Sequence, residues 1–394
     1  MKQKEIVIVA AKRTPIGAFL GQFSGTPTHE LGAAAINAAV SACSLASDEI
    51  DELIMGCVLP AGLGQAPTRQ AALTAGLSIS TPCTTINKVC GSGMKSVMQG
   101  FDAIIAGSAN IVVAGGMESM SRAPYLAPAT RQGARFGHSE LLDHMLFDGL
   151  QNASDGEAMG VFAEQCATHF NFSREQLDAF TIESVKRAMA ACNNGAFEDE
   201  LTPITIKTRG GEELITTDET PARCRPEKIP TLKPAFKKGG VITAANASSI
   251  SDGAAALVLM SADEAKARNI TPLARIIAHS SHAMQPEEFT LAPIHAIHKL
   301  YQKCNWNDND VDLYEINEAF AAVTMGAMHD LRLDHAKVNV NGGACALGHP
   351  IGASGTRIIV TLLHALHARG KQRGIASLCI GGGEATAIAL ETLA

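Results

Sequence analysis

Thr85-Ile86-Asn87-Lys88-Val89-Cys90-Gly91-Ser92-Gly93-Met94 is the stretch around which the rest of the chain is organised. The threonine, isoleucine and valine residues ahead of Cys90 favour a β-strand. Behind it, apolar residues recur at helical spacing from Met94 to Ile105. We therefore expect Cys90 at a strand-to-helix corner, where Gly91 and Gly93 allow a tight turn.

This corner suits a reactive cysteine. The free amides and the positive dipole end of a starting helix stabilise an anion placed there. A helix N-terminus therefore lowers a cysteine pKa from its ordinary value of about 8.5, which favours a nucleophilic thiolate. The alternative is a buried structural cysteine, because free cysteine commonly packs as a small apolar side chain.

Length and composition narrow the class of protein. A chain of 394 residues predicts two or three lobes, and 46% hydrophobic residues with 36 glycines predict an α/β protein with closely packed helices. Ten cysteines without paired spacing and a start without a signal peptide predict a reduced, cytoplasmic protein. The net charge of -7 gives no general attraction to nucleic acid, and no apolar run is long enough to span a membrane.

The final third of the chain repeats landmarks of the first third in the same order, which indicates a duplication. In the first third these are a strand, a helix and a second strand at Glu5–Ala11, Thr28–Ala42 and Asp48–Gly56. Their counterparts are Pro272–Ile277, Pro293–Cys304 and Asp308–Ile316. Two glycine-rich corners also match, since Gly352-Ala353-Ser354-Gly355 resembles the corner at Cys90 and Ile380–Glu384 resembles Ala114–Glu118.

We interpret the chain as two similar α/β halves with an insertion. The first half comprises residues 1–120 and is completed by residues 245–270; the second comprises residues 271–394. Residues 121–244 form an inserted loop domain with helices near Phe162–Phe170 and Gln176–Ala191. Its basic segment, from Lys207 to Lys238, is either a solvated surface or an anion-binding face.

Polar segments of the second half lie at predicted strand ends, where the duplication would bring them to Cys90. They are Asn317-Glu318-Ala319-Phe320, Gly348-His349-Pro350-Ile351-Gly352 and Cys379-Ile380-Gly381-Gly382-Gly383. His349 suits a base for the Cys90 thiol, with a structural histidine as the alternative. Cys379 follows a strand, so its thiol is either a buried strand-end cysteine or an exposed one beside amides that could bind an oxyanion. The Cys and His spacing is poor for zinc, so no metal is expected.

Together these blocks resemble the signature segments of the thiolase family. The resemblance covers essentially the whole chain and rests on Cys90-Gly91-Ser92-Gly93, Asn317–Phe320, Asn341–Gly352 and Cys379–Gly383. It implies a thiolase-like fold, with a five-layered αβαβα core of two similar halves and a loop domain that covers coenzyme A. It also implies a homodimer or a homotetramer.

The resemblance further implies a reversible Claisen condensation of two acetyl-CoA to acetoacetyl-CoA and CoA. Cys90 would be acetylated while His349 accepts its proton, and Cys379 would take an α-proton from the second acetyl-CoA. Asn317 would hold a water near the thioester oxygen, and the backbone amides of Cys90 and Gly381 would bind the tetrahedral oxyanion. This acyltransferase chemistry requires no metal or redox cofactor.

Contacts to coenzyme A also follow from the resemblance. Phe236 would lie near the adenine, and Arg223 is a candidate for the nucleotide phosphates. The pantetheine arm would lie along apolar residues and one hydroxyl: Leu150, Met159, Ala244, Ser248, Ala319 and Phe320.

One departure leaves the acyl chain length open. Where acetoacetyl-CoA thiolases usually carry His-Met-Gly, this chain has Ala158-Met159-Gly160. A longer-chain 3-ketoacyl-CoA thiolase is therefore the alternative within the family. A non-catalytic acyl-CoA-binding relative would not need the two cysteines and the histidine, and a decarboxylating ketosynthase would lack the second cysteine, Cys379.

Overall fold

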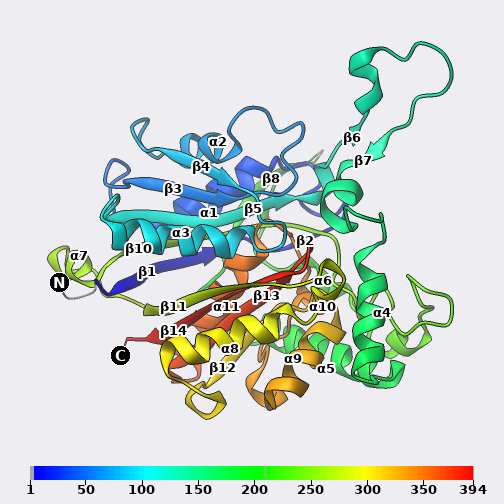
Figure 1. Ribbon diagram of the computed structural model, residues 1–394. Helices are drawn as coiled ribbons and strands as arrows, with labels where there is room; N and C mark the ends of the chain where they lie inside the picture. The colour runs from blue at the N-terminus through cyan, green and yellow to red at the C-terminus, as the bar shows by residue number, and fades with distance from the viewer. Residues whose placement is uncertain (1–3, 209, 394) are drawn as a thin grey trace.

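The structure, a computed structural model, describes residues 4–208 and 210–393 (Figure 1). Residues 1–3, on which the prediction about the start of the chain partly rests, lie outside the described residues. So does Arg209 of the predicted basic segment.

The first half is a sheet flanked by helices. Its strands lie in the order β1-β10-β5-β3-β4, with the short β2 (Gly17–Ala18) beside β10. The strands are β1 (Ile6–Arg13), β3 (Glu52–Gly56), β4 (Cys83–Ile86), β5 (Ile111–Ser119) and β10 (Ser251–Ser261). The helices are α1 (Thr28–Ala42), α2 (Pro67–Thr74), α3 (Ser92–Ala106) and α7 (Ala262–Ala267).

The second half repeats this topology. Its strand order β11-β14-β13-β12 corresponds to β1-β10-β5-β3, and a parallel bridge from Tyr314 to Val338 takes the place of β4. The strands are β11 (Ala274–Ala283), β12 (Leu313–Ile316), β13 (Arg373–Ile380) and β14 (Glu384–Thr392). The helices are α8 (Ala292–Cys304), α9 (Ala321–Leu331), α10 (Ala344–Leu347) and α11 (Ser354–Ala368).

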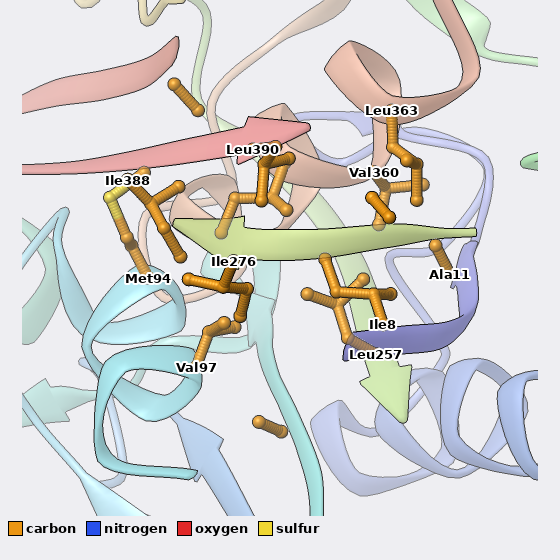
Figure 2. Close-up of a cluster of buried hydrophobic side chains, with 14 of the residues drawn as sticks. Ile8, Ala11, Met94, Val97, Leu257, Ile276, Val360, Leu363, Ile388 and Leu390 are labelled. Atoms are coloured by element: carbon orange, nitrogen blue, oxygen red, sulfur yellow. The ribbon is translucent and has the colours of Figure 1, made fainter. Parts of the chain in front are cut away.

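The two halves meet at a strand pair and across a shared layer of helices. Ile6 to Ile8 of β1 pair antiparallel with Ile276 to Ala274 of β11, so both halves share one continuous ten-stranded sheet, which the sequence did not predict. Side chains of α3 and α11 fill the space between the halves (Figure 2). The buried cluster there includes Met94, Val97, Ile276, Val360, Leu363 and Leu390.

Helices also cover the outer faces, which gives the core its five layers. Helices α1 and α2 pack on the first half and α8 and α9 on the second (Figure 1). Because both faces are covered, β5 and β10 are almost continuously apolar and buried, as is typical of strands with helices on both sides.

The inserted segment begins with a hairpin of β6 (Tyr125–Leu126) and β7 (Leu142–Asp143), which projects from the body (Figure 1). The segment continues through α4 (Met159–His169), α5 (Arg174–Asn193), β8 (Ile204–Thr208), β9 (Gly211–Ile215) and α6 (Glu219–Arg223). A capping box begins α5, because Ser173 and Gln176 each hydrogen-bond the backbone amide of the other. Within the described residues, no helix combines the length and apolarity that a membrane crossing requires.

Candidate active site

The chain turns sharply just before Cys90. Strand β4 ends at Ile86, so the expectation that it extends to Val89 is wrong. Val89 adopts a left-handed backbone with φ +47°, an outlier for a β-branched residue. Its amide donates to Asn87 Oδ1 at 2.8 Å, and the Lys88 amide donates to Ser92 Oγ at 2.8 Å. These hydrogen bonds hold Cys90 at the corner that opens α3.

The N-terminal ends of α3 and α11 meet at the centre of the molecule. Thr356 Oγ1 donates to the carbonyl of Gly93 at 2.8 Å. A Cβ added to Gly355 would lie 2.3 Å from the amide nitrogen of Met94, so the approach requires glycine there. The two glycine corners recognised in the sequence therefore face each other.

Cys90 faces the glycine turn after β13. Ile380 packs on Gly91 and Val89 lies beside Gly381, so the backbone amides of Gly381 and of Cys90 itself are near enough to the thiol to affect its pKa. Burial raises the pKa of the Cys90 thiol to about 11, and these two amides lower the pKa without offsetting burial. The helix end thus does not produce the lowered pKa expected from the sequence, because desolvation of the thiolate outweighs it.

Cys379 lies in the same site but is not exposed. It is the second-last residue of β13 and only 1% exposed, so of the two alternatives the buried strand-end cysteine is the one that the structure shows. Burial, and then the neighbouring Cys90 thiol, raise the pKa of Cys379 well above its ordinary value. Ile380, the next residue, packs on Gly91, and Val89 lies beside Gly381, so the two cysteines belong to corners that contact each other.

His349 is buried and held in one tautomer. Its Nδ1 lies 2.5 Å from Ser354 Oγ, and that hydroxyl donates its only proton to the carbonyl of Pro350 at 2.9 Å. Nδ1 must therefore carry the proton, which leaves Nε2 as an acceptor. Burial, followed by the charge of Arg357, lowers the pKa of His349 to about 3, so the imidazole is neutral at ordinary pH.

Asn317 completes the polar group. It follows β12, which runs parallel to β13, and its amide donates to the carbonyl of Ser377 at 3.0 Å. Asn317 Nδ2 lies 3.5 Å from His349 Nε2. Among the described residues, no group hydrogen-bonds the buried Asn317 Oδ1.

Sequence reasoning missed two residues that support this site. Ser354 was recognised only as part of a helix start, although it lies five residues after His349. Glu118 is fully buried at the end of β5, and its carboxylate accepts the amides of Val58, Leu59 and Gly352 at 2.9–3.2 Å. Burial raises the pKa of Glu118 to about 7, although these hydrogen bonds lower it. The sequence signal that could have identified Glu118 was the position of an acidic residue at the end of an apolar strand.

Several predicted coenzyme A contacts lie beside the two cysteines. Met159 packs against the buried cluster that contains Cys379, Ala319 and Phe320, whereas Leu150 and Cys90 pack against a second cluster around Leu59 and Ile351. A Cβ added to Gly381 would lie 3.6 Å from the sulfur of Met159, which places that residue at the same glycine turn.

The remaining predicted contacts extend outward from this point. Phe236 is 37% exposed and packs edge-on against Phe320, with ring centroids 6.0 Å apart. The Ser248 amide donates to the carbonyl of Ala319 at 2.9 Å, and Ala244 is exposed. Arg223 is exposed at the end of α6 and forms an ion pair with Glu219 at 2.5 Å, so its own chain already partners it.

Fold and site together define a class. Two α/β halves of the same topology meet at the starts of α3 and α11, and that meeting gathers two cysteines, a histidine and an asparagine from distant segments. This is a duplicated α/β protein of the thiolase-like class.

Comparison with known proteins identifies the family. Residues 6–263 match the N-terminal domain of thiolase, and residues 270–392 match its C-terminal domain. An acetyl-CoA acetyltransferase of Pseudomonas aeruginosa is 48% identical to this chain, and the match covers 98% of this chain and 99% of the relative. An acetyl-CoA acetyltransferase of Schizosaccharomyces pombe is 46% identical, and the match covers 99% of this chain and 100% of the relative. The crystal structure of Acat5 thiolase from Ascaris suum in complex with coenzyme A superposes with a TM-score of 0.94, at 42% identity over 99% of this chain and 100% of that chain. The chain belongs to the thiolase family.

Proposed function

We propose that the protein catalyses the reversible condensation of two acetyl-CoA to acetoacetyl-CoA and CoA, through an acetyl group on Cys90. The observation that carries the proposal is the contact between the Cys90 corner and the glycine turn that follows Cys379: Ile380 packs on Gly91, and Val89 lies beside Gly381. The names of the relatives, acetyl-CoA acetyltransferase, support the same reaction.

In the first half-reaction, the Cys90 sulfur attacks the carbonyl carbon of acetyl-CoA. His349 Nε2 takes the thiol proton, which neutral imidazole can do because Nδ1 already donates to Ser354. The amides of Cys90 and Gly381 bind the oxyanion while the bond between carbon and the CoA sulfur breaks; one such donor is typically worth about 10²- to 10³-fold in rate. The CoA thiolate leaves with the proton from His349.

In the second half-reaction, Cys379 gives its thiol proton to neutral His349, which passes that proton to the Cys90 thiolate when it is expelled, and the Cys379 thiolate removes an α-proton from another acetyl-CoA. The resulting carbanion attacks the acetyl group on Cys90, forms the new carbon–carbon bond and expels the Cys90 thiolate. Asn317 Oδ1, buried and unpaired among the described residues, can accept a hydrogen bond from a water that binds the thioester oxygen as enolate charge develops. Neither half-reaction requires a metal or a redox cofactor.

Coenzyme A would lie along Met159, Leu150, Ser248, Ala244, Ala319 and Phe320, with its adenine near Phe236. The apolar wall around Met159 and Phe320 suits the uncharged pantetheine arm, and the partly exposed ring of Phe236 can pack against the adenine. Arg223 is a candidate for binding the phosphates of coenzyme A, for which it would have to release its ion-pair partner Glu219.

A longer-chain 3-ketoacyl-CoA thiolase is the second candidate. Ala158 immediately precedes α4, where a methyl group leaves more room than an imidazole would. Chain length is therefore the point that an assay must decide.

Thiolysis assays test both candidates. Purified protein is given CoA with acetoacetyl-CoA or with a medium-chain 3-ketoacyl-CoA, and kcat/KM is compared, with Cys90→Ser as the control. A higher kcat/KM for acetoacetyl-CoA is the expected result, and a strong preference for the longer substrate would select the second candidate. Radiolabelled acetyl-CoA should label the wild-type protein but not Cys90→Ser; a folded protein that takes no label would be a non-catalytic binder.

The setting of this activity is part of the proposal. A reactive thiol pair suits a reducing compartment such as the cytoplasm, and ten cysteines without a disulfide among the described residues agree with that. A homodimer or homotetramer remains the predicted assembly, which light scattering of the purified protein would test.

A further inference from the structure

An ion pair joins the two catalytic corners. Lys88, two residues before Cys90, contacts Glu384, three residues after Gly381. The pair links the first half of the molecule to the second. Its side chains are 22% and 35% exposed, so it lies at the edge of the site rather than in the core.

The backbone is fixed on both sides of this contact. The Lys88 amide donates to Ser92 Oγ at 2.8 Å, and its carbonyl accepts the Gly91 amide at 3.0 Å. Glu384 is paired with Ile380 across the β13–β14 turn, and two glycines with φ near +90° precede it. Because neither backbone can move freely, contact between the two charged groups constrains the distance between the corners.

This distance matters for the oxyanion site. Ile380 packs closely on Gly91: a Cβ added to Gly91 would lie 2.3 Å from the Cδ1 atom of Ile380. Between that contact and the ion pair lies Gly381, which Val89 contacts and whose amide favours the Cys90 thiolate. An exposed ion pair contributes little to stability, whereas a displacement of about 1 Å in a reacting group can cost about 100-fold in rate.

We propose that the Lys88–Glu384 ion pair is a positioning contact that sets the spacing between the backbone amides of Cys90 and Gly381. The inference rests on the proposed function, because it assigns those amides to the oxyanion. It adds two residues that act through the positions of others and need not touch the substrate.

Charge neutralisation and charge exchange test the proposal. Lys88→Met and Glu384→Gln should each lower kcat for acetoacetyl-CoA thiolysis about tenfold, with KM changed less than about twofold, because one oxyanion donor is displaced but not lost. The exchanged double variant, Lys88→Glu with Glu384→Lys, should recover to within about threefold of wild type. Glu49→Gln is the matched control, since Glu49 is also 35% exposed and paired with an arginine, Arg268; it should leave kcat unchanged.

The alkylation rate of Cys90 by iodoacetamide, followed by mass spectrometry of its peptide, separates positioning from simple electrostatics. Loss of the Gly381 amide contact should slow alkylation in both single variants, because that amide favours the thiolate. A purely electrostatic role would slow Lys88→Met but accelerate Glu384→Gln, because a removed cation and a removed anion act oppositely on a thiolate.

Three results would overturn the inference: single variants within twofold of wild type, an exchanged variant no better than the singles, or faster alkylation in Glu384→Gln. If the wild-type protein has no thiolase activity, the proposed function fails, and the alkylation comparison still tests the ion pair.

Discussion

Acidification should destabilise the protein through His349, and replacing this residue by asparagine should remove that sensitivity. His349 is 5% exposed, and burial lowers its pKa to about 3. The ordinary pKa of histidine is about 6.5. The folded protein therefore keeps the imidazole neutral while the unfolded chain binds a proton below pH about 6.5. Stability is fully present above that pH and falls as the pH decreases toward about 3.

The size of the effect follows from the two pKa values. Each pH unit between them costs about 1.4 kcal/mol, so His349 accounts for about 2 kcal/mol at pH 5 and about 4 kcal/mol at pH 3, where the folded imidazole is itself half protonated. Typical domains are stable by only about 5–15 kcal/mol. A loss of about 2 kcal/mol is therefore readily measured.

Urea unfolding followed by circular dichroism at pH 7.5, 6 and 5 provides the assay. The difference in unfolding free energy between wild type and His349→Asn should shift by about 2 kcal/mol in favour of the variant between pH 7.5 and pH 5. His138→Asn, at an exposed position, is the control and should follow the wild-type curve. If the wild-type and His349→Asn curves are parallel, His349 titrates alike in both states and the argument from burial fails.

Three further changes have expected outcomes. Burial raises the pKa of Glu118 to about 7, so between pH about 4.5 and about 7 the folded state holds a proton that the unfolded chain releases. The wild-type protein should therefore lose about 3 kcal/mol of stability as the pH rises across this range. Glu118→Gln should remove this loss, which urea titrations at several pH values measure. Cys379→Ser should still accept radiolabelled acetyl on Cys90 but lose about 10²- to 10⁴-fold in condensation rate, the usual size of acid–base catalysis, and a rate near wild type would remove Cys379 from the mechanism. Gly160→Ala should raise KM for CoA several-fold in steady-state assays with little change in kcat, because the added Cβ would lie 2.3 Å from the ring of Phe236; an unchanged KM would separate Phe236 from CoA binding.

Local sequence patterns were sufficient to predict most of the helices and strands. The apolar strand at Ile6–Arg13, the small-residue helix at Thr28–Ala42 and the capped helix after Ser173 follow from periodicity and capping alone, because these depend on neighbours along the chain. The ordered repeat of glycine corners indicated the duplication, which the matching strand orders of the two halves bear out. The boundaries proposed for the two halves and the insertion remain predictions.

Which residue types stand near the strand ends, namely Cys90, Asn317, His349 and Cys379, could be predicted from the amino-acid sequence. Their chemical state depends on the folded arrangement. Desolvation raises the pKa of both thiols and lowers that of His349, and Ser354 selects the tautomer of His349. A pattern along the chain reports spacing, whereas burial and partners depend on segments that approach one another across more than a hundred residues. The solvation of an ionisable group is set by everything that surrounds it in space, and for that reason it could not be read from its neighbours in sequence.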